Sequence, residues 1–207
     1  MKLLYQTHSP YARKALVFAH EAGLADRIEV IHHETSPTVR NDTVFAQNPL
    51  GKVPVLLRAE QPPIFDSDVI CAYLHTLHDR PKLIPQEGEP RLAALTMQSV
   101  AQGMADAGIA IRWETVRRPK HMRHTQLATG YAEKLAASYD WLETRIEPEA
   151  RLHVGHIAVG TVLSWLQFRE LPAFADRPAL TQWFREFERR PSMLATPLSG
   201  NTVDAES

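Results

Sequence analysis

The sequence contains a single cysteine, Cys71, among its 207 residues, so no disulfide can form within the chain. Such cysteine usage is typical of proteins in a reducing compartment and predicts a cytoplasmic location. Long apolar runs are also missing, since no stretch approaches the roughly 18 residues that span a bilayer. Residues 1–6 are too short for a secretory signal. These absences predict a soluble, intracellular, globular protein with no membrane partner.

Neither positive nor negative charge is in excess, because 23 basic and 24 acidic residues give a formal net charge of −1. Such a balance produces no strong field that would attract nucleic acid or an anionic membrane surface. Residues 112–124 are locally basic, but Trp113 is their only aromatic residue. This segment is therefore interpreted as a solvated helix end, and no nucleic-acid partner is predicted.

Ten histidines are present, and some are spaced for one helical face, such as His75 with His78 and His153 with His156. A zinc site needs three or four convergent ligands with supporting partners, and the sequence does not supply such a set. Cys71 lies in a helical run, where burial in the core is the expected role. We therefore predict no metal site.

The first 79 residues alternate short β-type and helical runs. The pattern predicts the order β-α-β-α-β-β-α, which makes a small α/β unit. The expected strands are 2–6, 27–33, 53–57 and a very short 64–65 after a turn at 61–63, and the expected helices are 10–22, one turn within 34–47, and 67–78.

Residues 80–88 are rich in proline and glycine and predict a linker. Apolar residues at helical spacing then predict an all-helical domain over 89–207, with helices at 89–117, 124–146, 154–168 and 178–189. The helix at 154–168 is apolar nearly all round, so it is expected in the middle of the bundle. The tail from Pro197 is small and polar, and it is expected to be frayed.

Ser9 stands where the first strand passes into the first helix, in the stretch "YQTHSPYARK". Serine at the N-cap followed by proline at the first helical position is a common helix start. A hydroxyl there can also donate to a bound thiolate. Lowering a thiol pKa by ~2 units needs ~2.7 kcal/mol. A charge-assisted hydrogen bond supplies ~1.5–3 kcal/mol and a helix N-terminus up to ~2 kcal/mol, so either role is physically reasonable.

Two further stretches can carry a binding site. In "NPLGKVPVL", Val53 precedes Pro54; a cis bond there would expose the Val53 backbone to a ligand, although a strand-initiating proline explains the pattern equally well. In "IFDSDVICAYL", Asp66 and Ser67 stand at the start of a helix. The free N–H groups of a helix N-terminus suit a carboxylate and Asp66 suits an ammonium, whereas the simpler interpretation is that Ser67 caps the helix.

Together, "SPYARK", "NPLGKVPVL" and "FDSDVICAYL" resemble the glutathione-binding half of the cytosolic glutathione S-transferases. "KLLYQTHSPYARKALV" is most similar to bacterial members with serine at the start of the first helix, and "DAGIAIRWETVRRP" is similar to their fourth helix. The resemblance covers nearly the whole chain. It implies a thioredoxin-like α/β domain followed by an all-α domain, a homodimer, and a role in detoxification.

Residue by residue, the resemblance implies that Ser9 donates to the glutathione thiolate and that Val53 pairs its backbone with the cysteinyl unit beside a cis Pro54. Tyr5 is a rival to Ser9, because other classes of the family use a tyrosine near the end of the first strand. The "SPY" sequence favours the serine type. A tyrosine in a strand is also more often part of the core.

The resemblance further implies that Asp66 and Ser67 hold the γ-glutamyl end of glutathione and that Lys52 meets the glycyl carboxylate. Lys52 is the weaker assignment, since a solvated surface lysine would look the same. The second substrate would contact the long fourth helix, where Met104 and Trp113 are candidates that core packing explains equally well.

The chain departs from the family before the buried helix, where a Ser or Thr and, three residues later, an Asp usually form a capping box. His153 and His156 occupy these positions. Neither is expected to be a good substitute, at a cost of ~1 kcal/mol, so an irregular helix start is predicted.

Three functions remain open at this point. The first is a transferase that conjugates glutathione to small electrophiles. The second is another glutathione-dependent enzyme on the same scaffold, such as an isomerase, a dehalogenase or an ether-cleaving enzyme. The third is a non-catalytic binding module, and the intact set of Ser9, Pro54 and the Asp66-Ser67 pair argues against it. The identity of the electrophile is not encoded in any motif.

Overall fold

The structure is a computed structural model that describes residues 1–147 and 150–204. Its internal contacts divide the chain into two units. The first comprises Met1–Leu92 together with the chain from Pro191 onward, and the second is Ala93–Arg190. The sequence predicts a linker at 80–88 and an all-helical domain from residue 89. These domain boundaries stay a prediction.

The first unit has the predicted order of strands and helices. Its elements are β1 (Lys2–Tyr5), α1 (Pro10–Glu21), a 3-10 turn (Ala25–Arg27), β2 (Glu29–His32), α2 (Asp42–Phe45), β3 (Val55–Arg58), β4 (Gln61–Ile64), α3 (Ser67–His75) and the late α8 (Pro191–Leu194). The strands form one sheet in the order β2-β1-β3-β4. β1 runs parallel to β2, while β3 is antiparallel to both of its neighbours. This thioredoxin-like sheet confirms the predicted α/β fold.

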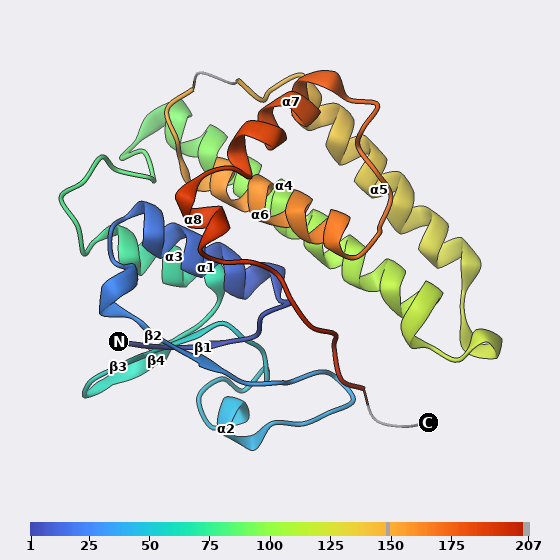
Figure 1. Cartoon of the computed structure of the whole chain (residues 1–207), viewed down its shortest axis with the longest axis horizontal. Helices are drawn as coiled ribbons and strands as arrows, with labels where there is room; N and C mark the ends of the chain where they lie inside the picture. Colours follow the sequence, from blue (N-terminus) through green and yellow to red (C-terminus); the bar gives the residue numbers. More distant parts are fainter. Residues whose placement is uncertain (148–149, 205–207) are drawn as a thin grey trace. The chain divides into compact units, whose positions relative to one another are not determined.

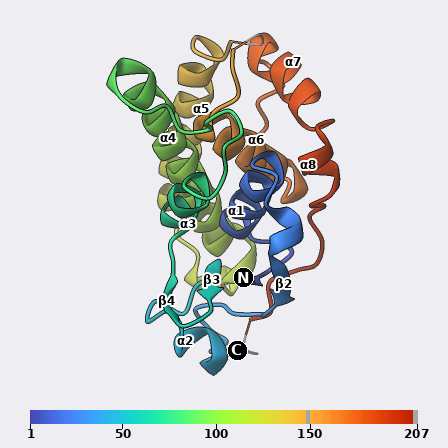
Figure 2. The same cartoon turned by 90° about the vertical axis from the view of Figure 1, so that its left-hand side faces the viewer.

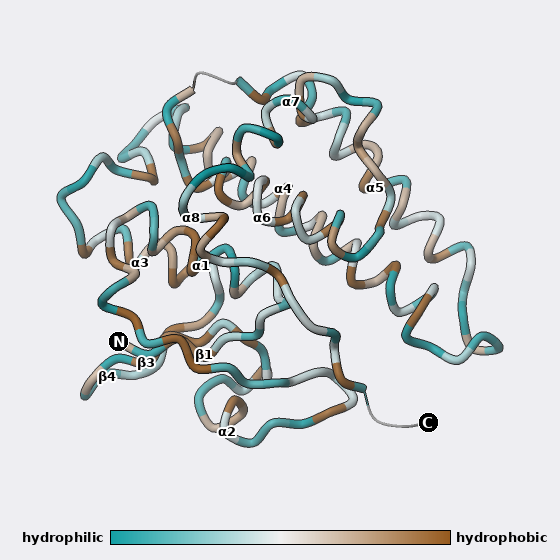
Figure 3. The backbone as a smooth tube through the Cα atoms, in the orientation of Figure 1, coloured by the Kyte–Doolittle hydropathy of each residue, from teal (hydrophilic) through white to brown (hydrophobic). Residues whose placement is uncertain are grey.

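Within this unit, α1 and α3 cover one face of the sheet and α2 lies on the other side, as the two views of Figures 1 and 2 show. The apolar runs of β1 and β3 account for this layering, because Leu3, Leu4, Val55 and Leu56 are all buried. Figure 3 shows these central strands in brown, the hydrophobic end of the scale. Burial of such side chains contributes about 1.5–3 kcal/mol each and fixes the sheet against the helices.

The turn predicted at residues 61–63 is wrong, whereas the predicted fourth strand is present and begins earlier than expected. The turn is at Ala59 and Glu60, where Glu60 has a φ of +55°, and Gln61–Ile64 is a strand rather than a turn. Its two prolines suggested a break because proline cannot donate to a sheet. β4 is however an edge strand, where only one side of the backbone has to pair, and prolines are tolerated there.

The helical part consists of α4 (Gly88–Arg112), a π-helical turn (Trp113–Arg117), a 3-10 turn (Lys120–Met122), α5 (Thr125–Glu143), α6 (Val154–Phe168) and α7 (Pro178–Phe187). The expectation for α6 is confirmed, because nearly all its side chains are buried. Gly160 permits this packing: a Cβ there would lie 2.2 Å from the ring of Phe187. None of the helices in the described part of the chain has the length and apolarity to cross a bilayer.

The helix start at α6 contradicts the expected irregularity. His153 is a regular N-cap residue, with Nδ1 accepting hydrogen bonds from the backbone N–H groups of Gly155 (3.1 Å) and His156 (3.4 Å). A neutral imidazole nitrogen therefore does what a Ser or Thr oxygen does in the family. The ring of His156 stacks on that of His153 with centroids 3.7 Å apart, which holds the cap in place.

The C-terminal segment is not frayed up to Asp204. After α8 it runs along the first unit, past the start of α1 and toward the loop before α2 (Figure 1). Arg13 of α1 donates to the Thr196 hydroxyl (3.4 Å) and to the Met193 carbonyl (3.2 Å). Further along, Ser199 is hydrogen-bonded to Thr7. Local composition could not reveal these contacts, because they join residues 180 or more positions apart.

Candidate glutathione site

The strand register brings the three predicted segments to one end of the sheet. β1 ends at Tyr5, directly before the turn that leads to Ser9. Since Leu4 pairs with Val55 in the antiparallel strand, the Val53–Pro54 step lies beside this end. β4 is antiparallel to β3 and pairs Ile64 with Leu56, so the chain leaves β4 toward Asp66 at the same end. Topology alone therefore gathers residues that are 57 positions apart in sequence.

Ser9 is the N-cap residue of α1, as the sequence predicted. Its Oγ accepts a hydrogen bond from the Ala12 N–H (3.2 Å), and Pro10 occupies the first helical position. Within the described part of the chain, no acceptor is bonded to the Ser9 O–H group. Capping uses a lone pair and leaves the proton free to be donated, so the two interpretations of Ser9 are compatible.

Val53 precedes a cis peptide bond to Pro54, the isomer that the resemblance implied. Val53 is buried, yet no described residue is hydrogen-bonded to its backbone N–H or C=O. Buried backbone groups are almost always paired. The Val53 backbone therefore offers one donor and one acceptor to an extended ligand.

The loop before Val53 is held by its own polar residues. Asn48 donates from Nδ2 to the Lys52 carbonyl (2.8 Å) and accepts from the Leu50 N–H (3.0 Å). Gly51 has a φ of +61°, and a Cβ there would collide with the Phe45 ring at 2.2 Å. The side chain of Lys52 is exposed, which leaves its ammonium group available to an anion.

Asp66, rather than Ser67, caps α3. Its Oδ1 accepts from the Asp68 N–H (2.8 Å) and from the Ser67 hydroxyl (3.2 Å). The simpler interpretation of Ser67 as the cap is therefore wrong. Ser67 is buried at the first position of the helix, whereas Asp66 is exposed. The pair presents a carboxylate and the N-terminal end of a helix side by side, which suits a zwitterionic head group.

Comparison with known proteins identifies the family. The family model described as "Glutathione S-transferase, N-terminal domain" matches residues 8–77. A glutathione transferase family member from Pseudomonas fluorescens Pf-5, crystallised with bound glutathione, is 32% identical, covers 96% of this chain and 99% of its own, and superposes with a TM-score of 0.92. This chain belongs to the glutathione S-transferase family.

A second crystal structure of the same Pseudomonas fluorescens Pf-5 target contains S-(propanoic acid)-glutathione; it is 32% identical, covers 97% of this chain and all of its own, and gives a TM-score of 0.87. The uncharacterized GST-like protein YibF of Escherichia coli is 29% identical over 202 residues, which are 95% of this chain and 98% of that protein.

Tyr5, the glutathione S-transferase alternative to Ser9, is a core residue here. It is 4% exposed, and burial raises the pKa of its phenol to about 12, against a smaller opposing effect of the Arg13 charge. A phenol that ionises so reluctantly is a weak donor to a thiolate. The geometry thus favours Ser9, which lies at the helix start.

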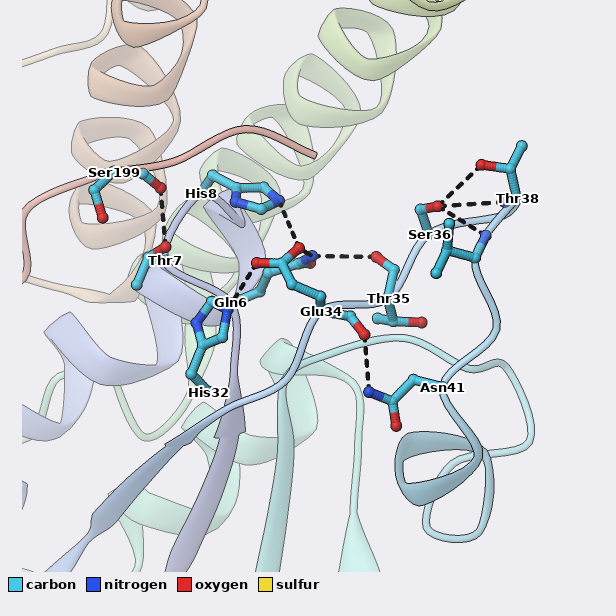
Figure 4. Close-up of polar contacts among 11 residues, drawn as sticks. Gln6, Thr7, His8, His32, Glu34, Thr35, Ser36, Thr38, Asn41 and Ser199 are labelled. Carbon is cyan, nitrogen blue, oxygen red and sulfur yellow. Dashed lines mark hydrogen bonds and ion pairs between the residues drawn. The ribbon is translucent and has the colours of Figure 1, made fainter. Parts of the chain in front are cut away.

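Sequence reasoning missed a polar cluster around Glu34, drawn in Figure 4. The Glu34 carboxylate accepts from Gln6 Nε2 (2.6 Å) and lies 2.7 Å from His32 Nε2 and 3.7 Å from His8 Nε2. β1 and β2 are parallel, so their carboxyl ends meet, and this pairing was the signal that could have found the cluster. It adjoins the Ser9 turn through His8.

The structure does not place the other candidate residues, Cys71, Met104 and Trp113, with the residues of the candidate site. Cys71 is fully buried, and burial raises the pKa of its thiol to about 12, so it is a core residue rather than a nucleophile. Met104 is also buried in the core, while Trp113 is half-exposed beneath the Arg117 guanidinium, 3.9 Å from the ring centroid. Across residues 1–147 and 150–204, no group of three or more His, Cys, Asp or Glu side chains is arranged to hold a metal ion.

Proposed function

We propose that this protein is a glutathione transferase that activates the glutathione thiol and transfers it to small electrophiles. The observation that carries the proposal is the convergence, at one end of the sheet, of three groups that match the three parts of the tripeptide. These are the free O–H of Ser9, the unpaired backbone of Val53 and the exposed carboxylate of Asp66. The 32% identical relative, crystallised with bound glutathione and with S-(propanoic acid)-glutathione, supports the choice of ligand.

Each part of the ligand has a partner of suitable chemistry. The γ-glutamyl ammonium pairs with Asp66, and its carboxylate lies at the α3 N-terminus beside Ser67. The cysteinyl backbone forms two hydrogen bonds with Val53 next to Pro54, as an added strand does at a sheet edge. Lys52 meets the glycyl carboxylate. This orientation directs the cysteinyl sulfur to Ser9.

Ser9 then stabilises the thiolate. A free thiol with a pKa of ~8.5 is only slightly ionised at neutral pH, and lowering this value by ~2 units requires ~2.7 kcal/mol. The Ser9 hydrogen bond and the positive end of α1 supply contributions of this size. The thiolate attacks the electrophilic carbon and forms the C–S bond. With a chloronitrobenzene the C–Cl bond breaks and chloride leaves with the bonding electrons, while the thiol proton passes to solvent.

A 32% identical relative was crystallised with S-(propanoic acid)-glutathione, in which the sulfur carries a carbon substituent, and this supports a reaction that forms a C–S bond at the glutathione sulfur. The same proposal includes a homodimer and a cytoplasmic role in detoxification. Light scattering of the purified protein tests the dimer: a mass of one chain contradicts it.

The deciding experiment combines calorimetry with a chromogenic conjugation assay. We expect saturable glutathione binding at or below millimolar concentration and conjugation to a chloronitrobenzene. Ser67→Ala should weaken binding, since it removes a group beside the γ-glutamyl end. Absence of any binding heat contradicts the proposal as a whole. Binding without conjugation of any electrophile in a broad panel contradicts the transferase reaction and leaves the glutathione site.

A further inference from the structure

The position of Ser9 depends on a tight turn. The Ser9 N–H donates to the Gln6 carbonyl (2.9 Å), which closes a turn with Thr7 and His8 as its two central residues. Ser9 follows directly and caps α1. Any displacement of the two central residues therefore moves the Ser9 hydroxyl relative to the helix N-terminus.

The first central residue, Thr7, is held by the C-terminal segment. The Thr7 hydroxyl donates to the Ser199 carbonyl (2.9 Å), and the Ser199 N–H donates to the Thr7 carbonyl (3.3 Å). Two hydrogen bonds in opposite directions, one from the Thr7 side chain and one between the two backbones, join Thr7 to Ser199, and Figure 4 shows the first of them. Gly200 follows with a φ of +81°, and a Cβ there would lie 3.6 Å from Thr7 Oγ1 and 3.7 Å from His8 Nδ1. The segment thus packs on both central residues.

The second central residue, His8, faces the carboxylate of Glu34, with 3.7 Å between Nε2 and Oε2. The His8 side chain is only 5% exposed, so its position is closely confined. Glu34 also accepts from Gln6 Nε2, the first residue of the turn, and its own carbonyl accepts from Asn41 Nδ2 (2.8 Å). The backbone of Glu34 is therefore held by Asn41, and its carboxylate contacts the turn at Gln6 and His8.

The C-terminal segment is anchored on both sides of Ser199. Before it, Arg13 bonds to Thr196 and Met193. After it, the Thr38 hydroxyl donates to Asp204 Oδ1 (2.8 Å). Because the C-terminal segment is hydrogen-bonded on both sides of Ser199, we expect Ser199 to hold Thr7 in a fixed position.

We infer that Ser199, through its backbone, and Glu34, through its carboxylate, are positioning residues for the Ser9 hydroxyl. The inference rests on the proposed function of Ser9. Hydrogen bonds weaken steeply when their angle is lost, so a hydroxyl that samples several positions stabilises a thiolate less well. Neither Ser199 nor Glu34 needs to touch glutathione in this arrangement.

The first test uses the fact that Ser199 contributes only backbone groups to Thr7. Ser199→Pro removes the N–H donor, while Ser199→Ala keeps both bonds and is the matched control. The readout is the pKa of enzyme-bound glutathione, measured by ultraviolet absorbance of the thiolate across pH. We expect Ser199→Pro to raise this pKa by about 0.5–1 unit. Ser199→Ala should leave it within ~0.2 unit, with glutathione affinity within a few-fold in both.

Glu34 gives an independent test. Glu34→Ala should raise the same pKa by about 0.5–1 unit, whereas Glu34→Gln keeps an acceptor for Gln6 and should recover at least half of the shift. A merely structural role would lower the melting temperature without moving the thiol pKa. The inference is overturned if neither Ser199→Pro nor Glu34→Ala moves the pKa beyond the wild-type error, or if Ser199→Ala moves it as far as Ser199→Pro.

Ser9→Ala in the same titration separates the two proposals. If it raises the pKa of the bound thiol while Ser199→Pro and Glu34→Ala do not, the role of Ser9 stands and only the positioning inference fails. If Ser9→Ala itself leaves the pKa unchanged, Ser9 is not the activating group, and both fail together.

Discussion

Lys14 of α1 is ion-paired with Asp68 of α3, and the two partners differ sharply in burial. The side chain of Lys14 is 4% exposed, whereas that of Asp68 is 40% exposed. The pair joins the two helices whose N-terminal residues, Ser9 and Asp66, form the candidate site. It therefore fixes the separation of these helices as well as contributing to stability.

The unequal burial predicts an unequal response to substitution. Asp68→Asn removes the carboxylate that is ion-paired with a buried ammonium group and should lower the free energy of unfolding by about 3 kcal/mol. Lys14→Met fills the same space and leaves an aspartate that water can reach, so its cost should be about 1 kcal/mol or less. Urea unfolding of both variants measures the difference. A larger loss for Lys14→Met than for Asp68→Asn would show that the lysine is not the desolvated partner.

Substitution of Ser9 should affect turnover far more than glutathione binding. Ser9→Ala removes a charge-assisted hydrogen bond and should reduce kcat about 10- to 100-fold. Ser9→Thr retains a hydroxyl and the cap and should recover much of this loss. Tyr5→Phe should leave kcat nearly unchanged, because Tyr5 is a buried core residue. Steady-state kinetics with a chromogenic electrophile give the answer, and loss of activity in Tyr5→Phe with full activity in Ser9→Ala would reverse the assignment.

Much of the first unit could be predicted because its signals are local. Ser9 with Pro10 marks the α1 start, and strands are spaced by helices in the order that the sequence indicates. The edge position of β4 was not predictable, since only the strand order shows that β4 has a neighbouring strand on one side alone. Likewise, the four-residue α8 is too short for periodicity to reveal.

The sequence suggests the residues of the candidate site, and their roles in binding stay a prediction, but the contacts that hold these residues in place could not be predicted. Ser9, Val53 and Asp66 lie in recognisable motifs, and the sheet register brings them together. Thr7 and Ser199 are 192 positions apart in the sequence, and no pattern in either segment predicts the contact between them. The imidazole cap of His153 was also missed, because histidine is rarely considered as a helix cap although a neutral ring nitrogen accepts hydrogen bonds well.

Asp66 has two roles that one substitution can separate. As the N-cap of α3 it accepts from Asp68 N–H, and as a carboxylate it is proposed to hold the glutathione ammonium. Asparagine caps a helix as well as aspartate but carries no charge. Asp66→Asn should therefore weaken glutathione binding about tenfold while leaving the melting temperature unchanged.

A ligand control makes this prediction specific. A glutathione analogue that lacks the γ-glutamyl amino group should bind the wild type and Asp66→Asn equally well, because the interaction at issue is missing in both cases. Calorimetry with both ligands and both proteins completes the cycle. If Asp66→Asn weakens the two ligands by the same factor, the carboxylate acts on the fold of the site rather than on the ammonium.

The stacked histidines at the start of α6 predict loss of stability in acid. Burial lowers the pKa of His153, and burial together with the neighbouring His153 and Arg190 lowers the pKa of His156 to about 3. Both values lie below the unfolded value of ~6.5. The unfolded chain therefore binds more protons as the pH falls below ~6.5, and the folded state loses up to about 1.4 kcal/mol per pH unit for one such histidine. For His156 this loss continues down to a pH of about 3.

Restoring the residues typical of the family should flatten this dependence. His153→Ser with His156→Asp supplies a hydroxyl cap and a carboxylate in place of two imidazoles, neither of which changes charge between pH 7 and 5. His75 and His78 also have pKa values lowered by burial, so some acid sensitivity will persist in the variant. The measured quantity is the difference in free energy of unfolding between variant and wild type at pH 7 and at pH 5. An equal difference at both pH values would mean that the pKa values of the two histidines are nearly the same in the folded and unfolded states, and that the stacked pair does not cause the loss of stability in acid.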